Sequence, residues 1–135
     1  MGTTTTTSNS VLRARSKQET LTTTQDISNN DAGVEFNIAT DAKVMTLPLI
    51  TTSNIGAEFT FRNIGADGNN IITLSPNAAD AINGTVAAVQ ASGVVNKDWI
   101  NTKATATTGD WVTLKAVELT GWYITGGDGV WASEA

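Results

Sequence analysis

The sequence of 135 residues contains no cysteine and no histidine. Without cysteine the chain forms no disulfide and no thiolate metal site. Without histidine it lacks the commonest general base and the commonest metal ligand, and both serine–histidine–aspartate and cysteine–histidine catalysis are excluded. We therefore expect a protein that is not an enzyme and that carries no cofactor and no metal.

Charge and long apolar runs are also scarce. Charged residues make up 16% of the chain, against a usual share of about 25%. Residues 20–135 hold five basic and twelve acidic side chains, a net charge of −7, which argues against nucleic-acid binding because phosphate contacts need a positive surface. No apolar run reaches the roughly 18 residues that span a membrane, and no secretory signal is apparent, so we expect folding in a cytoplasm.

Threonine takes the place of charge, with 23 residues, beside 12 glycines and only 2 prolines. Threonine is β-branched and suits a pleated, half-exposed surface, while glycine favours turns. This composition predicts strands and turns, and the length predicts a single folded domain.

The first 19 residues differ from the rest and are predicted to form an extended N-terminal arm. Residues 1–10 are of low complexity and bury too little apolar surface to offset the entropy of ordering. Arg13, Arg15 and Lys17 give the arm a net charge of +2 against Glu19. Two interpretations stay open: an inert tail, or an arm that orders on a protein partner through charge-assisted hydrogen bonds.

Alternating apolar and polar residues predict half-buried strands at 34–38, 57–63 and 111–117. An Asp-Gly turn signal at 67–68 predicts that residues 58–64 and 71–74 form a hairpin. Residues 85–90 suit a helical turn and a strand equally. About eight to ten short strands predict an all-β fold over residues 20–135, a small antiparallel β-sandwich or a jelly-roll-like barrel.

Five aspartates in predicted turns are the candidates for metal binding or glycosidase chemistry: Asp67, Asp80, Asp98, Asp110 and Asp128. The favoured interpretation is that they cap turns, because no loop carries the repeated acidic ligands that a calcium site needs. The glycine-rich stretch 126–129 opens no predicted helix and lacks a Walker lysine, so it does not predict a phosphate site.

Aromatic residues offer a second kind of candidate site, in which tryptophans line a sugar-binding face. Packing in the core or at a subunit interface is the favoured alternative, because aromatic side chains concentrate in both places. The side chains concerned are Trp99, Trp111, Trp122 and Trp131, with Tyr123 beside them.

A series of short motifs runs through residues 44–131. It begins with Thr-Leu-Pro at 46–48, Gly-Ala-Glu-Phe-Thr-Phe-Arg-Asn at 56–63, Ile-Thr-Leu-Ser-Pro at 72–76 and Asp-Ala-Ile-Asn-Gly at 80–84. It continues with Thr-Lys-Ala-Thr-Ala-Thr-Thr-Gly-Asp-Trp-Val-Thr-Leu at 102–114 and Gly-Trp-Tyr-Ile at 121–124. Together these motifs resemble small structural proteins of tailed bacteriophages, a group that includes capsid decoration (cement) proteins and fibre domains.

The resemblance implies a virion protein on the capsid exterior, with the major capsid protein and further copies of itself, as a homotrimer, for partners. An N-terminal arm and a length too short for a fibre shaft favour decoration, with Arg13, Arg15 and Lys17 as capsid-binding residues. The alternative is a tail-fibre, receptor-binding or carbohydrate-binding module. Neither implies catalytic residues, nucleic-acid binding or membrane binding.

Overall fold

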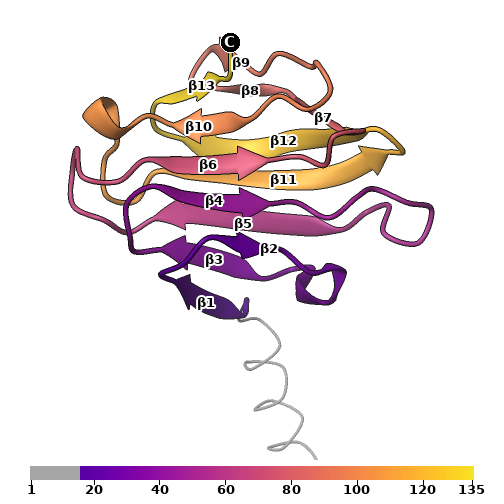
Figure 1. Cartoon of the computed structure of the whole chain (residues 1–135), viewed down its shortest axis with the longest axis horizontal. Coiled ribbons are helices and arrows are strands. Elements are labelled where there is room, and N and C mark those ends of the chain that lie inside the picture. The colour runs from indigo at the N-terminus through magenta and orange to yellow at the C-terminus, as the bar shows by residue number, and fades with distance from the viewer. Residues whose placement is uncertain (1–15) are drawn as a thin grey trace, which may run out of the picture.

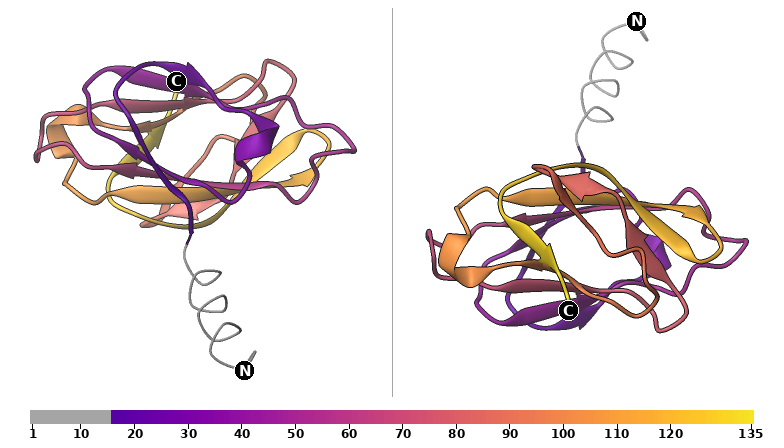
Figure 2. Two further views of the ribbon diagram at one scale, coloured as in Figure 1. Left: turned by 90° about the horizontal axis from the view of Figure 1, so that it is seen from below. Right: turned by 90° about the horizontal axis from the view of Figure 1, so that it is seen from above.

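Two β-sheets pack face to face in the computed structural model, which describes residues 16–135 (Figure 1). The six-stranded sheet has, in spatial order, strands β1 (Gln18–Leu21), β3 (Glu35–Ile38), β5 (Glu58–Asn63), β11 (Trp111–Glu118), β12 (Gly121–Asp128) and β7 (Ala81–Asn83). The five-stranded sheet has strands β13 (Trp131–Ser133), β10 (Trp99–Asn101), β6 (Ile72–Ser75), β4 (Lys43–Thr46) and β2 (Gln25–Asp26). The expected all-β sandwich is therefore confirmed, and its two layers stay separate rather than closing into a barrel (Figure 2).

The N-terminal half of the sandwich winds as a flattened coil. Strands β1 to β6 enter the two sheets alternately, so that β1, β3 and β5 run parallel in one sheet and β2, β4 and β6 run parallel in the other. The prediction of a wholly antiparallel, jelly-roll-like arrangement is wrong for this half. Period-2 alternation reports which side chains share a face, and it is the same for parallel and antiparallel neighbours.

The predicted hairpin of residues 58–64 and 71–74 is also wrong. β5 pairs with β3 and β11, whereas β6 lies in the opposite sheet between β4 and β10. The turn around Gly68, with φ of +68°, is present, but it sits in a loop that carries the chain across the core. Phe59 and Phe61 on one strand and Leu74 on the other are fully buried, and the crossing lets both strands bury these side chains between the sheets.

Antiparallel pairing governs the C-terminal half. β11 pairs with β5 and β12, and β10 pairs with β6 and β13, while β7 runs parallel to β12 at the edge. Val112, Leu114 and Ala116 point inward and are fully buried, as their alternation predicts. A short hairpin of β8 (Thr85–Val86) and β9 (Val89–Gln90) lies beside this half.

The hairpin of β8 and β9 resolves the ambiguity at residues 85–90 in favour of strands. Its two central residues, Ala87 and Ala88, have φ values of +48° and +68°. Two successive positive φ values are typical of the type I′ turn, which matches the twist of paired strands and usually carries Asn-Gly. The Ala-Ala pair carries no such signal, so this turn could not be predicted from the sequence.

Three tryptophans and three phenylalanines fill the core. Phe36 and Phe61 stack with centroids 5.6 Å apart, and Phe59 lies 5.7 Å from Trp122. Across the core, Trp99 and Trp131 from neighbouring strands stack with an interplanar angle of 6° and centroids 6.2 Å apart. These aromatic pairs add about 1 kcal/mol each to the stabilisation from apolar burial.

Candidate functional site

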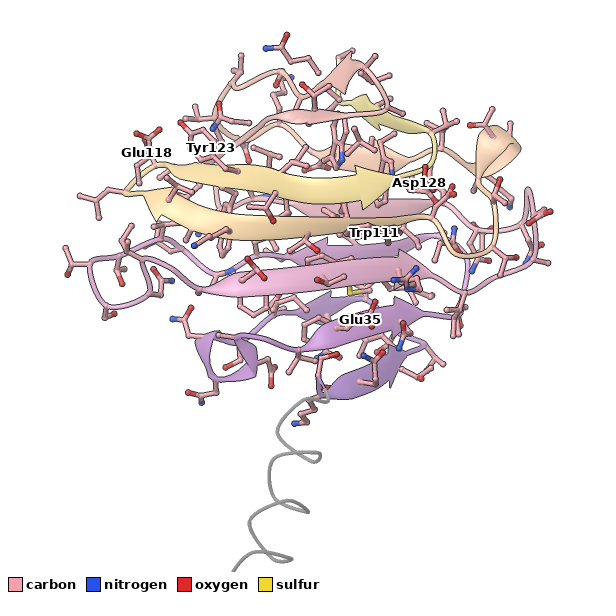
Figure 3. The ribbon with its side chains drawn as sticks, turned by 180° about the vertical axis from the view of Figure 1, so that it is seen from behind. Glu35, Trp111, Glu118, Tyr123 and Asp128 are labelled. Atoms are coloured by element: carbon pink, nitrogen blue, oxygen red, sulfur yellow. The ribbon has the colours of Figure 1, made fainter. Side chains whose placement is uncertain are left out.

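The outward face of the six-stranded sheet carries a group of polar and aromatic side chains that hold one another in position. We call it the Trp111 face, and Figure 3 views it directly. The side chains that define it come from β3, β5 and β11: Glu35, Thr60, Arg62, Trp111 and Thr113. Each lies opposite an inward-facing apolar neighbour, so burial of the core orients the whole group outward.

Arg62 is the centre of the Trp111 face. Its Nε donates to Oε1 of Glu35 at 3.0 Å, Nη2 lies 2.9 Å from the same oxygen in an ion pair, and Nη1 donates to the carbonyl oxygen of Gly109 at 3.0 Å. The Cζ atom lies 5.7 Å from the centroid of the Trp111 ring, a cation–π distance. Three partners therefore hold the guanidinium group in one orientation before any ligand arrives.

Trp111 lies against a glycine of the neighbouring strand. A Cβ atom on Gly126 would come within 3.1 Å of Cη2 of the indole. The absence of that atom leaves room for the ring to lie close to the sheet, where it remains partly exposed. The glycine-rich stretch 126–129 thus serves packing at this position, with no helix following it.

Hydrogen bonds made by side-chain hydroxyl groups complete the Trp111 face and its neighbourhood. Oγ1 of Thr60 and Oγ1 of Thr113 lie 2.7 Å apart on facing strands. Farther along β12, Oη of Tyr123 donates to Oε1 of Glu118 at 2.8 Å. That hydrogen bond, together with partial burial and the nearby charge, raises the pKa of Tyr123, so the phenol stays neutral and acts as a donor.

Of the arm residues predicted to bind a partner, Arg13 and Arg15 lie outside the described residues. Lys17 is exposed, and its carbonyl oxygen accepts a hydrogen bond from the amide of Glu35 at 2.9 Å. β1 begins at Gln18, so the end of the predicted arm already belongs to the sheet. Lys17 consequently stands at the edge of the same sheet that carries the Trp111 face.

The four tryptophans do not share one environment. Trp99, Trp122 and Trp131 are at most 1% exposed and belong to the core, whereas Trp111 lies on the outer surface. A sugar-binding row of tryptophans is thereby excluded, and only Trp111 is available to a ligand. Its partners Glu35 and Arg62 were not singled out from the sequence, although the alternation of residues 57–63 already placed Arg62 outward.

Four of the five aspartates accept hydrogen bonds from backbone amides, and the predicted capping of a local turn applies to Asp110 and Asp128 only. Asp67 accepts from Thr108, Asp80 from Ile50, and Asp110 from Thr107. Asp128 accepts from Gly129 at 2.9 Å, and the fifth, Asp98, is half-buried. Within residues 16–135, no three acidic side chains are grouped so as to hold a metal ion.

Asp80 is unusual among them because it is fully buried and only one of its two carboxylate oxygens accepts a hydrogen bond. Its Oδ2 accepts from the amide of Ile50 at 3.0 Å, and its Oδ1 has no hydrogen-bond partner. Burial raises the pKa of Asp80 above the ordinary 3.8, although the hydrogen bond from Ile50 opposes the change. The ionised carboxylate therefore destabilises the folded state relative to the protonated one.

Replacing Asp80 with asparagine should raise the melting temperature at neutral pH by about 3 °C, or on the order of 1 kcal/mol. The amide keeps an acceptor for Ile50 and removes the buried charge. The folded-state pKa of Asp80 is raised, so the protonated carboxyl contributes its full stability at pH values below the ordinary pKa of 3.8. That contribution is lost as the pH rises through the folded-state pKa. The advantage of the variant in thermal melts should vanish below about pH 3.5; an advantage independent of pH would contradict this assignment.

Comparison with known proteins adds no relative: no family model and no curated protein matches the chain. Over residues 16–135, no helix has the length and apolarity needed to cross a membrane. The site must therefore be interpreted from its own chemistry. A fixed guanidinium group beside a partly exposed indole, on an open sheet, offers a surface for binding.

Proposed function

We propose that this protein is a capsid decoration protein of a tailed bacteriophage, which binds the outer surface of the assembled head and stabilises the shell. The observation that carries the proposal is the preformed Arg62–Trp111–Glu35 cluster on an open sheet face. Arginine and tryptophan are the residue types that dominate binding energy at protein interfaces. A contact whose side chains are already ordered loses little entropy when the partner docks.

The position of β1 supports a second contact with the same partner. Lys17 leads into β1, the edge strand of the sheet that carries the Trp111 face. When two linked contacts share one partner, binding at the first raises the effective concentration for binding at the second. The overall affinity then increases without any additional type of contact. Assembly as a homotrimer would multiply this effect further.

Stabilisation of the shell then follows from mass action. A ligand that binds the assembled lattice and not its separated subunits lowers the free energy of the lattice by RT ln(1 + [L]/Kd). This amounts to about 2.7 kcal/mol per site at a free concentration of 100 times Kd. Decoration in this sense needs tight, static binding and no catalytic group.

The test is occupancy of purified heads that lack the protein, measured over a range of added protein concentrations. Trp111→Ala should bind about 30-fold more weakly, the consequence of losing roughly 2 kcal/mol at an interface centre. Ile100→Ala is the matched control, since Ile100 is partly exposed on the five-stranded sheet and should bind normally. Equal binding by wild type and Trp111→Ala would refute docking through the Trp111 face.

Truncation of the arm tests the second contact. Removing residues 2–15 leaves β1 intact and should weaken retention on heads, most strongly at low salt, because high salt screens the charged contacts that the arginines of the arm make in the full chain. Unchanged occupancy would show that the arm is an inert tail.

A carbohydrate-binding module is the second candidate, because the indole of Trp111 lying against Gly126 offers a surface on which a sugar ring can stack. Glycan-array binding that is lost in Trp111→Ala, without any binding to heads, would favour this alternative.

A further inference from the structure

The six-stranded sheet ends in a strand whose outer backbone groups pair with nothing among residues 16–135. That strand is β1, which pairs only with β3 and is the outermost strand of the sheet in Figure 1. The amide of Glu35 donates to the carbonyl oxygen of Lys17 at 2.9 Å, which fixes the direction of the ladder. Because the peptide groups of a strand alternate in direction, the amides and carbonyl oxygens of Gln18 and Thr20 point away from β3, to the open edge.

The other edge of the same sheet, by contrast, is covered. The amide of Gly93 donates to the carbonyl oxygen of Ile82 at 3.1 Å, and that of Ala91 donates to the carbonyl oxygen of Gly84 at 2.9 Å. The chain that follows β9 therefore occupies the outer side of β7. In the part of the chain that the structure describes, β1 has no such cover, no proline removes an amide from Gln18–Leu21, and no bulge interrupts its register with β3.

The exposed side chains of β1 belong to the same surface as the Trp111 face. Thr20, Asn37, Arg62 and Trp111 form one cross-strand row, and Nδ2 of Asn37 donates to Oε1 of Gln18 at 2.9 Å. Three strand spacings place the open edge about 14 Å from Trp111. A standard interface buries about 800 Å² on each partner, a footprint roughly 28 Å across. A partner centred on Trp111 therefore reaches the open edge.

We infer that the open edge of β1 takes an extended segment of the shell protein as an added strand. Unpaired amides and carbonyl oxygens that repeat every second residue, about 6.7 Å apart, are matched by the backbone of another extended polypeptide. Gln18 and Thr20 supply these groups, so recognition at this edge uses the main chain of the partner. The inference rests on the proposed function and names the part of the partner that binds beside the Trp111 face.

A second copy of this protein fits the same edge less well. An antiparallel pair of β1 strands that uses Gln18 and Thr20 of both copies places their two Glu19 side chains directly opposite each other. Glu19 lies on the inward side, beside Phe36, and such a charge on an edge strand disfavours pairing between identical edges. This pairing is also two-fold, whereas a trimer needs head-to-tail contacts. A shell segment with a neutral or basic residue opposite Glu19 meets no such repulsion.

The variant that tests the added strand is Thr20→Pro, measured by occupancy of purified heads that lack the protein. Proline removes the outward amide of Thr20 and places its ring in the path of an incoming strand, while the ladder to β3 uses Glu19 and Leu21. Binding to heads should weaken about tenfold or more. Thr20→Val keeps the amide and the branched side chain, so it is the matched control and should bind within about twofold of wild type. Equal binding by the two variants would overturn the inference.

Hydrogen exchange of the wild-type protein tests the same edge without a variant and decides the matter if Thr20→Pro melts much earlier than wild type. The amides of Gln18 and Thr20 should exchange rapidly in the free protein and at least about tenfold more slowly on heads. Slow exchange in the free protein that disappears when residues 2–15 are removed would assign the edge to the arm of the same chain. Slow exchange that depends on protein concentration would assign it to a second copy, and either result would overturn the inference.

Failure of this inference and failure of the proposed function give different results. If the wild-type protein does not occupy heads, the proposed function is refuted, and the shell is refuted as the partner of β1 along with it. If wild type binds heads and Trp111→Ala binds more weakly, but Thr20→Pro binds like Thr20→Val and exchange at Thr20 is unchanged on heads, only the added strand is refuted.

Discussion

Replacing Gly129 with alanine should destabilise the protein by about 3–5 kcal/mol, which is enough to unfold many domains of this size. Gly129 has φ of +103°, a region that residues with a Cβ rarely adopt. An added Cβ would also lie 2.3 Å from Cγ and 2.5 Å from Oδ1 of Asp110. The carboxylate cannot withdraw without losing its hydrogen bonds from Asn101 and Thr107.

The chain offers a matched control for Gly129→Ala. Gly109 has a similar φ of +100°, but an added Cβ would meet no atom within 4 Å. Gly109→Ala should therefore cost only the backbone strain, about 1–2 kcal/mol. Urea denaturation of both variants separates strain from collision with Asp110, and equal losses of stability would contradict the collision.

Asn101→Ala should cost about 3–4 kcal/mol, the second largest effect that we expect. Asn101 is fully buried, and its Oδ1 accepts from Nδ2 of Asn63 at 2.8 Å. Its own Nδ2 donates to Asp110 and to the carbonyl oxygen of Val130, both at 3.0 Å. Removing the side chain leaves a buried amide, a carboxylate and a carbonyl each short of one partner.

The appropriate control for Asn101→Ala is an amide outside the core. Nδ2 of Asn37 donates to Oε1 of Gln18 at 2.9 Å on the surface, where water can replace the lost partner. Asn37→Ala should stay within about 0.5 kcal/mol of wild type in the same denaturation measurement. Similar losses for both variants would show that the buried amide network contributes little.

These buried polar side chains also bear on the Trp111 face. Asp110 directly precedes Trp111, and the carbonyl oxygen of Gly109 accepts a hydrogen bond from Arg62. The network of Asn101 and Asp110 therefore holds the loop that positions the proposed docking cluster. A weakened network should increase the mobility of Arg62 and Trp111 as well as lower the stability of the fold.

Much of this protein could be anticipated from alternation alone. Inward positions on β5 and β11 are occupied by the apolar residues that the period-2 pattern selects, whereas the favoured interpretation of Trp111 as a core or interface residue did not anticipate its place on the outer surface of the domain. Turn capping by Asp110 and Asp128 follows from the preference of aspartate for nearby backbone amides. Each of these conclusions depends on local geometry, which neighbouring residues in the sequence determine.

By itself, then, the sequence determined that the domain is built from strands, which faces of those strands are buried, and that histidine and cysteine chemistry is excluded. Only the tertiary structure decided which strands are neighbours. The flattened coil of β1 to β6, the meeting of Arg62 with Glu35 and Trp111, and the hydrogen bonds of Asp80 with Ile50 and Asn96 all join residues distant in sequence. The physical reason is that alternation encodes the facing of a strand and carries no record of its partner, which packing across the core selects.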